Sequence, residues 1–389
     1  MIPKAIIVGG SIGGLTVALL LRDLGCDVEV YERSPSDLEG RGAGIVLHRA
    51  SGRYLSERLG LPLDEFSEKA PWFRFLQADG TISYQVPCRY RFTAWTSLYR
   101  PLRAALADER YHLDQEMVSL EPAGDEVTVD LAGGRRQSGS LVVAADGIAS
   151  TARQQLFPQA VPVFAGYLGW RGVVRESELE AAQFERLYQA ITYFTPPRSH
   201  ILSYPIPAQG ERLLNYVWYR NLTGPFAEAM TDRHGDLRQL SVPPGMVRLE
   251  LVEDLRTEAA RILPPDLAAM VIATEHPFIQ AVVDVEVERV VLGRVALVGD
   301  AAFVARPHAA AGTAKAAADA WDLASALATT GDIDTALALY EPAALARGRR
   351  LVERARRLGA MAQLEGRFRA GDPAIIFGLD RAGDSCFDE

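Results

Sequence analysis

One segment near the N-terminus restricts the possible folds more than any other. KAIIVGGSIGGLTVALLLRDLGCDVEVYERS occupies residues 4–34. Its apolar run at 5–8 predicts a parallel strand buried on both faces, followed by a tight turn, a helix and a second strand over 28–31. Gly9, Ser11 and Gly14 occupy the three positions of a GxGxxG turn, with serine in the middle place. This pattern predicts a dinucleotide-binding unit whose helix start presents free amides to a pyrophosphate.

Two further buried-strand patterns end in an acidic residue. Residues 141–145 run into Asp146-Gly147, and residues 295–298 run into Gly299-Asp300. Because ligands of such sheets lie beyond the carboxyl ends of the strands, Glu32, Asp146 and Asp300 are expected at one edge. Carboxylates there suit the hydroxyls of a ribose and a sugar-alcohol chain. Without a ligand, Glu32 would be an ordinary charge at a strand end, and the first motif alone leaves NAD and FAD open.

Composition disfavours several classes of protein. The chain has 389 residues, 48% of them hydrophobic, as expected for a packed core. Its net charge of −9 disfavours nucleic acid or an anionic membrane as the partner. The N-terminal apolar run is too short and too charged for a membrane span. Three scattered cysteines indicate a reducing cytoplasm, and the six histidines lack the spacing of a metal site, so no metal is expected.

The middle of the chain follows a different pattern. Aromatic, β-rich segments separated by Pro and Gly fill residues 161–277, and residues 72–87 are similar. The predicted fold is α/β with an α+β insertion: a Rossmann-like domain, a mainly antiparallel substrate domain and C-terminal helices. The predicted nucleotide domain comprises residues 1–71, 88–160 and 278–365. The predicted substrate domain comprises residues 72–87 and 161–277, and residues 366–389 form a C-terminal extension.

Taken in order, the motifs resemble a known family. Residues 146–153 fit DGxxSxxR, and residues 299–320 fit a GDAA motif followed by a proline, a glycine-rich helix start and an Asp-Ala pair. The chain resembles the FAD-dependent aromatic hydroxylases, which are single-component flavoprotein monooxygenases. The resemblance implies FAD, NADH or NADPH, and O2, with hydroxylation of an electron-rich hydroxylated ring through a flavin hydroperoxide. Phe303 replaces the histidine usual after GDAA.

The same resemblance implies the cofactor contacts. Glu32 would hold the adenosine ribose, Asp300 the ribityl chain, and Asp146 with Arg153 the pyrophosphate and the incoming nicotinamide. The backbone near Val118 would meet the adenine. The expected cofactor-binding residues are Gly9, Ser11, Ile12, Gly14, Glu32, Arg33, Val46, Val118, Asp146, Arg153, Asp300, Pro307, Gly312, Thr313, Ala314 and Lys315.

The alanine-rich stretch 309–314 gives a physical reason to expect a flavin ring at this site. Small side chains let a flat ring approach the backbone, and a helix beginning near Gly312 would direct its amides at the pyrimidine end of a reduced, anionic flavin. Lys315 in the first turn opposes the helix dipole, so an anionic neighbour is expected to compensate it. The alternative is a solvated surface lysine.

His308, His48 and Tyr219 are the candidate catalytic residues. A histidine beside the ring could accept a hydroxyl proton, because its ordinary pKa lies near neutral pH. The alternatives are a turn-forming role for His308 and a core position for His48 and Tyr219; Tyr204 and His200 are weaker candidates.

The segments YLGWRGVV, RPHAAAGTAKA and GDPAIIFGL resemble the subgroup that oxygenates N-heteroaromatic rings such as dihydroxypyridines. A phenolic or benzoate-type substrate, a flavin-free dehydrogenase and a non-oxygenating flavoprotein are the alternatives. An arginine-rich helix over 347–357 predicts a solvated face or a subunit contact, the latter as in a homodimer.

Overall fold

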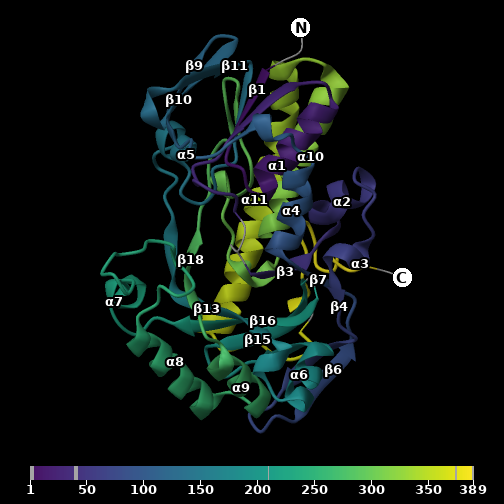
Figure 1. Cartoon of the computed structure of the whole chain (residues 1–389), viewed down its shortest axis with the longest axis vertical. Coiled ribbons are helices and arrows are strands. Elements are labelled where there is room, and N and C mark those ends of the chain that lie inside the picture. Colours follow the sequence, from purple (N-terminus) through teal and green to yellow (C-terminus); the bar gives the residue numbers. More distant parts are fainter. Residues whose placement is uncertain (1–3, 39–42, 209, 373–374, 388–389) are drawn as a thin grey trace.

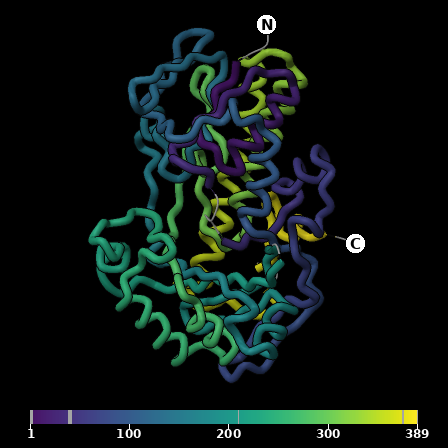
Figure 2. Tube along the Cα trace, in the orientation of Figure 1, coloured from purple at the N-terminus to yellow at the C-terminus, as the bar shows by residue number. Residues whose placement is uncertain are grey.

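The computed structural model describes residues 4–38, 43–208, 210–372 and 375–387. Its long axis separates an upper part, which contains the first strand, from a lower part built around a large sheet, and the long helix over residues 333–359 runs from one part to the other (Figure 1). The chain trace leaves the upper part and returns to it more than once (Figure 2). The fold is therefore α/β with a β-rich insertion, as expected.

The upper sheet has six strands in the order β19-β20-β12-β1-β2-β8. All neighbours are parallel except β19 and β20. The strands are β1 (Lys4–Val8), β2 (Asp27–Tyr31), β8 (Tyr111–His112), β12 (Leu141–Ala144), β19 (Val291–Leu292) and β20 (Val295–Leu297). The four predicted strands are present, within one residue at each end. The associated helices are α1 (Ile12–Asp23), α4 (Trp95–Ala104), α5 (Thr151–Leu156), α10 (Gly312–Thr330) and α11 (Ile333–Gly359).

The lower sheet has eight strands in the order β17-β18-β13-β16-β15-β14-β5-β6. Every pair is antiparallel except β14 with β5. The strands are β5 (Trp72–Leu76), β6 (Ile82–Pro87), β13 (Val163–Arg175), β14 (Ala190–Phe194), β15 (His200–Ala208), β16 (Glu211–Asn221), β17 (Ser241–Val242) and β18 (Phe278–Asp284). The helices beside it are α6 (Ala181–Tyr188), α7 (Phe226–Met230), α8 (Leu249–Ile262) and α9 (Pro265–Ala273).

Two smaller antiparallel sheets complete the fold, with the orders β3-β7-β4 and β11-β10-β9. Their strands are β3 (Gly44–Leu47), β4 (Glu68–Lys69), β7 (Arg91–Ala94), β9 (Met117–Ala123), β10 (Glu126–Leu131) and β11 (Arg136–Gly139). The short helices α2 (Arg49–Glu57) and α3 (Leu63–Phe66) adjoin the first of these sheets. None of the helices in the described ranges has the length and apolar character needed to cross a bilayer.

Strand pairing moves one predicted domain edge. β18 pairs with β13 and β17 in the lower sheet, although the predicted boundary assigned residues 278–365 to the nucleotide domain. The substrate sheet thus extends to Asp284, because an apolar strand that leads back towards the nucleotide domain looks the same in either sheet. The rest of the division into domains stays a prediction.

Small residues bring α1 and α10 close together. A Cβ on Gly13 would lie 3.2 Å from the Cβ of Ala316, and one on Gly299 would lie 2.9 Å from that same atom. Ala317 and Ala320 are fully buried. Beyond its first turn, α10 is therefore rich in alanine because it packs against α1 and the loop after β20.

Candidate functional site

A cavity of about 300 Å³ opens beyond the carboxyl ends of β1, β2 and β12. Its lining includes six of the predicted cofactor residues: Gly9, Ser11, Glu32, Arg33, Asp146 and Asp300. Three acidic side chains from segments far apart in the chain thus face one space, as their strand-end positions predict.

The turn between β1 and α1 requires its glycines. Gly9 has φ +100°, and a Cβ there would lie 2.3 Å from the carbonyl oxygen of Ala145. A Cβ on Gly14 would lie 1.9 Å from the Gly9 oxygen, so the helix packs directly on the turn. Glu32 accepts hydrogen bonds from the amides of Gly10 (2.8 Å) and Ser34 (2.9 Å), which holds its carboxylate at the cavity wall. Ile12, the first residue of α1, is buried rather than lining the cavity.

A second cavity of about 410 Å³ adjoins the first, and Asp300 and Trp95 line both. The N-terminal end of α10, the loop before it and the lower sheet enclose this space. The predicted residues that line it are Val46, Asp300, Pro307, His308, Gly312, Thr313 and Tyr219. Ala314 lies just behind, in a buried apolar cluster. A ligand that spans both cavities would pass Asp300.

The start of α10 is open towards this second cavity. No side chain caps the helix at Ala311, so the first amides keep their hydrogen-bonding capacity. Gly312 is exposed, and a Cβ there would meet nothing within 4 Å. The end of a 19-residue helix therefore presents partial positive charge at an unobstructed surface.

Protein atoms surround the carboxyl groups of Asp300 and Asp146 and change their pKa values. The Asp300 side chain is exposed to the cavities yet enclosed by the protein around them. Burial raises its pKa, while the charges of Lys315 and Arg153 act in the opposite sense. Burial also raises the pKa of Asp146, whose carboxylate accepts the Ala152 amide at 3.2 Å. Both groups are placed to accept hydrogen bonds from ligand hydroxyls.

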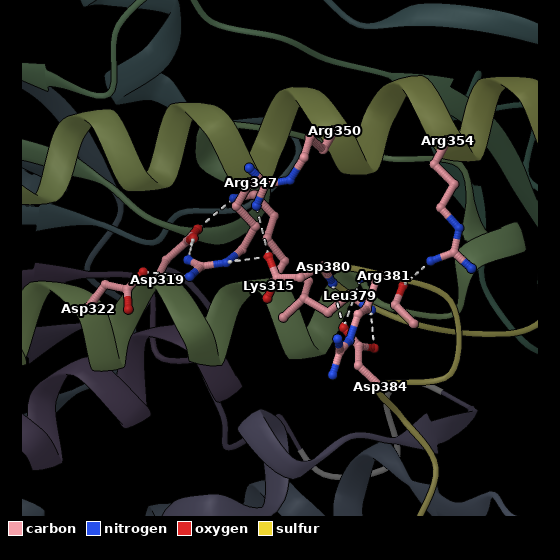
Figure 3. Close-up of polar contacts among 11 residues, drawn as sticks. Lys315, Asp319, Asp322, Arg347, Arg350, Arg354, Leu379, Asp380, Arg381 and Asp384 are labelled. Atoms are coloured by element: carbon pink, nitrogen blue, oxygen red, sulfur yellow. Dashed lines mark hydrogen bonds and ion pairs between the residues drawn. The ribbon is translucent and has the colours of Figure 1, made fainter.

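Lys315 has the anionic neighbour that its position predicts and is not a solvated surface lysine, but it lines neither cavity. Its Nζ donates to the Asp319 carboxylate at 2.5 Å and to the Gly299 carbonyl at 2.9 Å, and the side chain is 1% exposed. Asp319 in turn accepts the Gly299 amide at 3.0 Å and a bond from Arg347 at 3.2 Å (Figure 3). The anion that compensates Lys315 is thus a carboxylate one helical turn later. The pair holds the loop that carries Asp300.

The structure places neither Arg153 nor Val118 in the lining of the two cavities. Arg153 is completely buried, and its guanidinium donates to backbone carbonyls that include those of Asp300 and Ala301. It joins the loop after β12 to the loop after β20 and does not face a ligand. Val118 is 61% exposed, and the residues 115–117 just before it line the first cavity instead. The adenine contact expected of the backbone near Val118 stays a prediction.

His308 lies in the second cavity beside two tyrosines. Its Nε2 is 2.6 Å from the Tyr167 hydroxyl, and its Nδ1 has no partner among the described residues. The Tyr219 ring lies 4.9 Å away, centroid to centroid. Burial, together with the charge of Arg306, holds the pKa of His308 well below its usual value. The ordinary pKa on which the prediction of a base relied does not hold, because a buried imidazole resists protonation. The role of His308 as a base stays a prediction.

His48 does not line the second cavity. Its Nε2 lies 2.9 Å from the carbonyl oxygen of Ala310, whose φ of +54° is unusual for a residue with a side chain. Burial lowers the pKa of His48 to about 4. The prediction of a catalytic His48 is corrected to a positioning role: it holds the turn that precedes α10.

The arginine-rich helix is not a bare solvated face. Arg347 contacts Asp319 and Asp322, Arg350 pairs with Asp380, and Arg354 donates to backbone carbonyls of the C-terminal extension (Figure 3). These residues attach the extension to α11. Attraction to segments distant in sequence cannot be read from a run of like charges, so the pattern predicted a solvated face or a subunit contact and did not indicate these pairs.

The sequence did not indicate several residues of the second cavity. Trp95, Tyr193, Phe368 and Phe377 contribute aromatic walls, the last two from the C-terminal extension. Residues 373–374 of the GDPAIIFGL segment lie outside the described ranges. His200, a weaker candidate, also lines the cavity; it hydrogen-bonds Gln363 at 2.8 Å, and burial lowers its pKa to about 3. Arg171 also lines this space. In the sequence it belongs to the YLGWRGVV segment, which served only to indicate the subgroup of the family.

This arrangement fits a dinucleotide that carries a flat ring. A cramped glycine turn and ribose-binding carboxylate lie at one end, hydroxyl acceptors at the middle, and an unobstructed helix start under an aromatic cavity at the other. Two FAD-binding family models match the chain, "FAD binding domain-like" over residues 164–284 and "FAD binding domain" over residues 253–355. The chain belongs to the FAD-dependent monooxygenases that hydroxylate aromatic rings.

Its similarity to individual members is specific. It is 36% identical, over 97% of its own length and 96% of the relative's, to a 2,6-dihydroxypyridine 3-monooxygenase of Paenarthrobacter nicotinovorans. It is 27% identical, with 87% and 86% covered, to a 6-hydroxynicotinate 3-monooxygenase of Pseudomonas fluorescens. The solved structure of a 2,6-dihydroxypyridine-3-hydroxylase from Arthrobacter nicotinovorans matches with a TM-score of 0.94 at 35% identity and covers 98% of both chains.

Proposed function

We propose that this FAD enzyme uses NADH or NADPH and O2 to hydroxylate a hydroxylated N-heteroaromatic ring, with dihydroxypyridines as the first candidates. The observation that carries the proposal is the similarity along the whole chain to an enzyme named for 2,6-dihydroxypyridine. The second cavity supports it, because its aromatic walls and polar groups suit a small polar ring.

Glu32, Asp146 and Asp300 would hold the hydroxyls of FAD, and Gly312 with Thr313 would receive its ring at the start of α10. Bound FAD supplies hydride acceptance from the nicotinamide and activation of O2, the chemistry that amino-acid side chains lack. The chain's own contribution is positioning and the exclusion of water. His308, neutral at physiological pH, would donate or accept one hydrogen bond to the substrate through Nδ1, while Tyr167 occupies Nε2.

The direct test is turnover of the purified yellow holoenzyme. NADH and NADPH consumption is measured with a panel of hydroxypyridines and hydroxybenzoates, together with H2O2 release and incorporation of label from 18O2. Labelled product from hydroxypyridines is the expected result. Label found only in hydroxybenzoates would replace the substrate class, and oxidation that yields H2O2 with every ring would contradict the hydroxylase assignment.

Two further proposals concern the setting of the enzyme. The three cysteines, all free, suit a reducing cytoplasm, which fractionation of the native cells would test. A homodimer is proposed without support from a subunit contact, and light scattering at micromolar concentration would decide between one and two chains.

A further inference from the structure

Arg171 is a cation in the substrate cavity with most of its hydrogen-bonding capacity unused. Its side chain extends from β13. Nη1 donates a hydrogen bond to the Gln280 side chain at 2.9 Å, and Nη2 donates one to the Gly44 carbonyl at 3.0 Å. Two of its five N–H groups are thus used. Its Nε is buried without a partner among the described residues. The two bonds fix the plane of the guanidinium, since they attach it to two different strands.

No carboxylate in the described ranges pairs with Arg171, whereas Arg306 pairs with Asp284 and Arg347 with Asp319. Apart from Asp300, it is the one Lys, Arg, Asp or Glu among the described residues that line the second cavity. Its charge acts on the hydroxyls of Tyr204 and Tyr219, whose pKa values burial raises and Arg171 lowers. Arg171 is therefore a cation in the wall of the space the ring would occupy.

The neighbouring histidines do not offer an alternative means of ionising the ring. Burial lowers the pKa of His200 to about 3 and holds that of His308 far below neutral, so both are weak bases. A ring attacks an electrophilic oxygen atom faster when its own hydroxyl is ionised, so the cavity needs another way to favour the anion. A fixed guanidinium favours an oxyanion by charge-assisted hydrogen bonds.

We propose that Arg171 binds the ionised ring oxygen of the substrate and so makes the cavity selective for hydroxy-N-heteroaromatics in their anionic form. This inference rests on the proposed function. In the step, the ring O–H bond breaks, its electron pair stays on the oxygen, and the proton leaves to solvent before or during binding. Arg171 acts as a specificity-determining residue, and no protein base is required.

The test compares two probe ligands in the FAD-loaded protein. 2,6-Dihydroxypyridine can ionise, whereas 2,6-dimethoxypyridine cannot. Dissociation constants are measured by the change in flavin absorbance, and the ultraviolet spectrum of the bound dihydroxypyridine reports its charge. Arg171→Gln is expected to weaken binding of the dihydroxypyridine by about 10- to 100-fold and to change that of the dimethoxypyridine by less than about threefold.

Arg175→Gln is the matched control. Arg175 lies on the same strand, but it is 56% exposed and pairs with Glu178 at 3.3 Å, so both dissociation constants should stay as in the wild type. Arg171→Lys, which keeps the charge without the planar fork, should retain part of the preference for the ionisable ligand. FAD content and melting temperature show that each variant is folded.

Three results would overturn the proposal: equal loss of both ligands in Arg171→Gln, unchanged binding of the dihydroxypyridine in Arg171→Gln, or a neutral spectrum for dihydroxypyridine bound to the wild type. If Arg171→Gln does not fold, the spectrum of dihydroxypyridine bound to the wild type and the ligand preference of Arg171→Lys still test the proposal. Failure of the wild type to hydroxylate any hydroxypyridine would instead refute the proposed function. Hydroxylation with unchanged binding in Arg171→Gln would refute the role of Arg171 alone.

Discussion

Removing the Asp319 carboxylate should destabilise the protein and release its flavin together. Asp319 accepts the Gly299 amide, the Lys315 ammonium and the Arg347 guanidinium, and both Asp319 and Lys315 are 1% exposed. Asp319→Ala would leave a buried lysine without its counter-ion, a change that costs about 3–5 kcal/mol. For a chain of this length, with an unfolding entropy of about 2.1 cal/mol/K per residue, that corresponds to a fall in melting temperature of about 4–6 °C.

The assay is thermal unfolding followed by circular dichroism, with flavin absorbance measured after gel filtration. Asp319 and Lys315 both bond the backbone of Gly299, which precedes Asp300. Because their pairing holds this backbone in place, the FAD content should fall as well. Asp322→Ala is the control: Asp322 also pairs with Arg347, at 2.6 Å, but is 35% exposed, so its loss should cost no more than about 1 kcal/mol. A melting temperature for Asp319→Ala within about 1 °C of the wild type, with full FAD content, would refute the view that this pair supports the site.

Three other predictions follow from the site. Gly312→Val should unfold at the wild-type temperature but bind FAD poorly in equilibrium dialysis, because the side chain would enter open space at the helix start; normal FAD binding would place the ring elsewhere. His308→Ala should keep FAD yet release more H2O2 per NAD(P)H consumed, and unchanged coupling would remove His308 from the reaction. Since the pKa of His48 falls from 6.5 to about 4 on folding, the unfolded chain binds the extra proton between these values, so stability should decrease as the pH falls from 6.5 to 4. In His48→Gln this decrease, followed by melting temperature, should be smaller; an identical pH profile would contradict a buried neutral His48.

The parts of the fold that could be predicted are those with a local signal. Buried parallel strands are continuous apolar runs, so β1, β2, β12 and β20 were recognisable, and so were the acidic residues at their ends. The edge of the substrate sheet was misplaced because β18 resembles a strand of either sheet. Its membership depends on pairing with β13, more than one hundred residues away in sequence.

In the site, too, only the features with a local signal in the sequence could be predicted. Lys315 and Asp319 stand four residues apart on a predicted helix, so their pairing has a signal in the sequence. The position of Arg171, by contrast, depends on Gln280 and on Gly44, which lie on two other strands. The aromatic contributions of Phe368 and Phe377 depend on how the C-terminal extension folds back. Neither has a local signature.

The central claim is that strand ends distant in sequence bind one FAD molecule, and Asp300 tests it most directly because it lines both cavities. The decisive measurement is the dissociation constant of FAD for wild-type and Asp300→Ala apoprotein, determined by titration of flavin fluorescence. Loss of an acceptor for ligand hydroxyls inside the cavities predicts binding weakened by about 10-fold or more, with an unchanged melting temperature of the apoprotein. An unchanged dissociation constant would contradict the account.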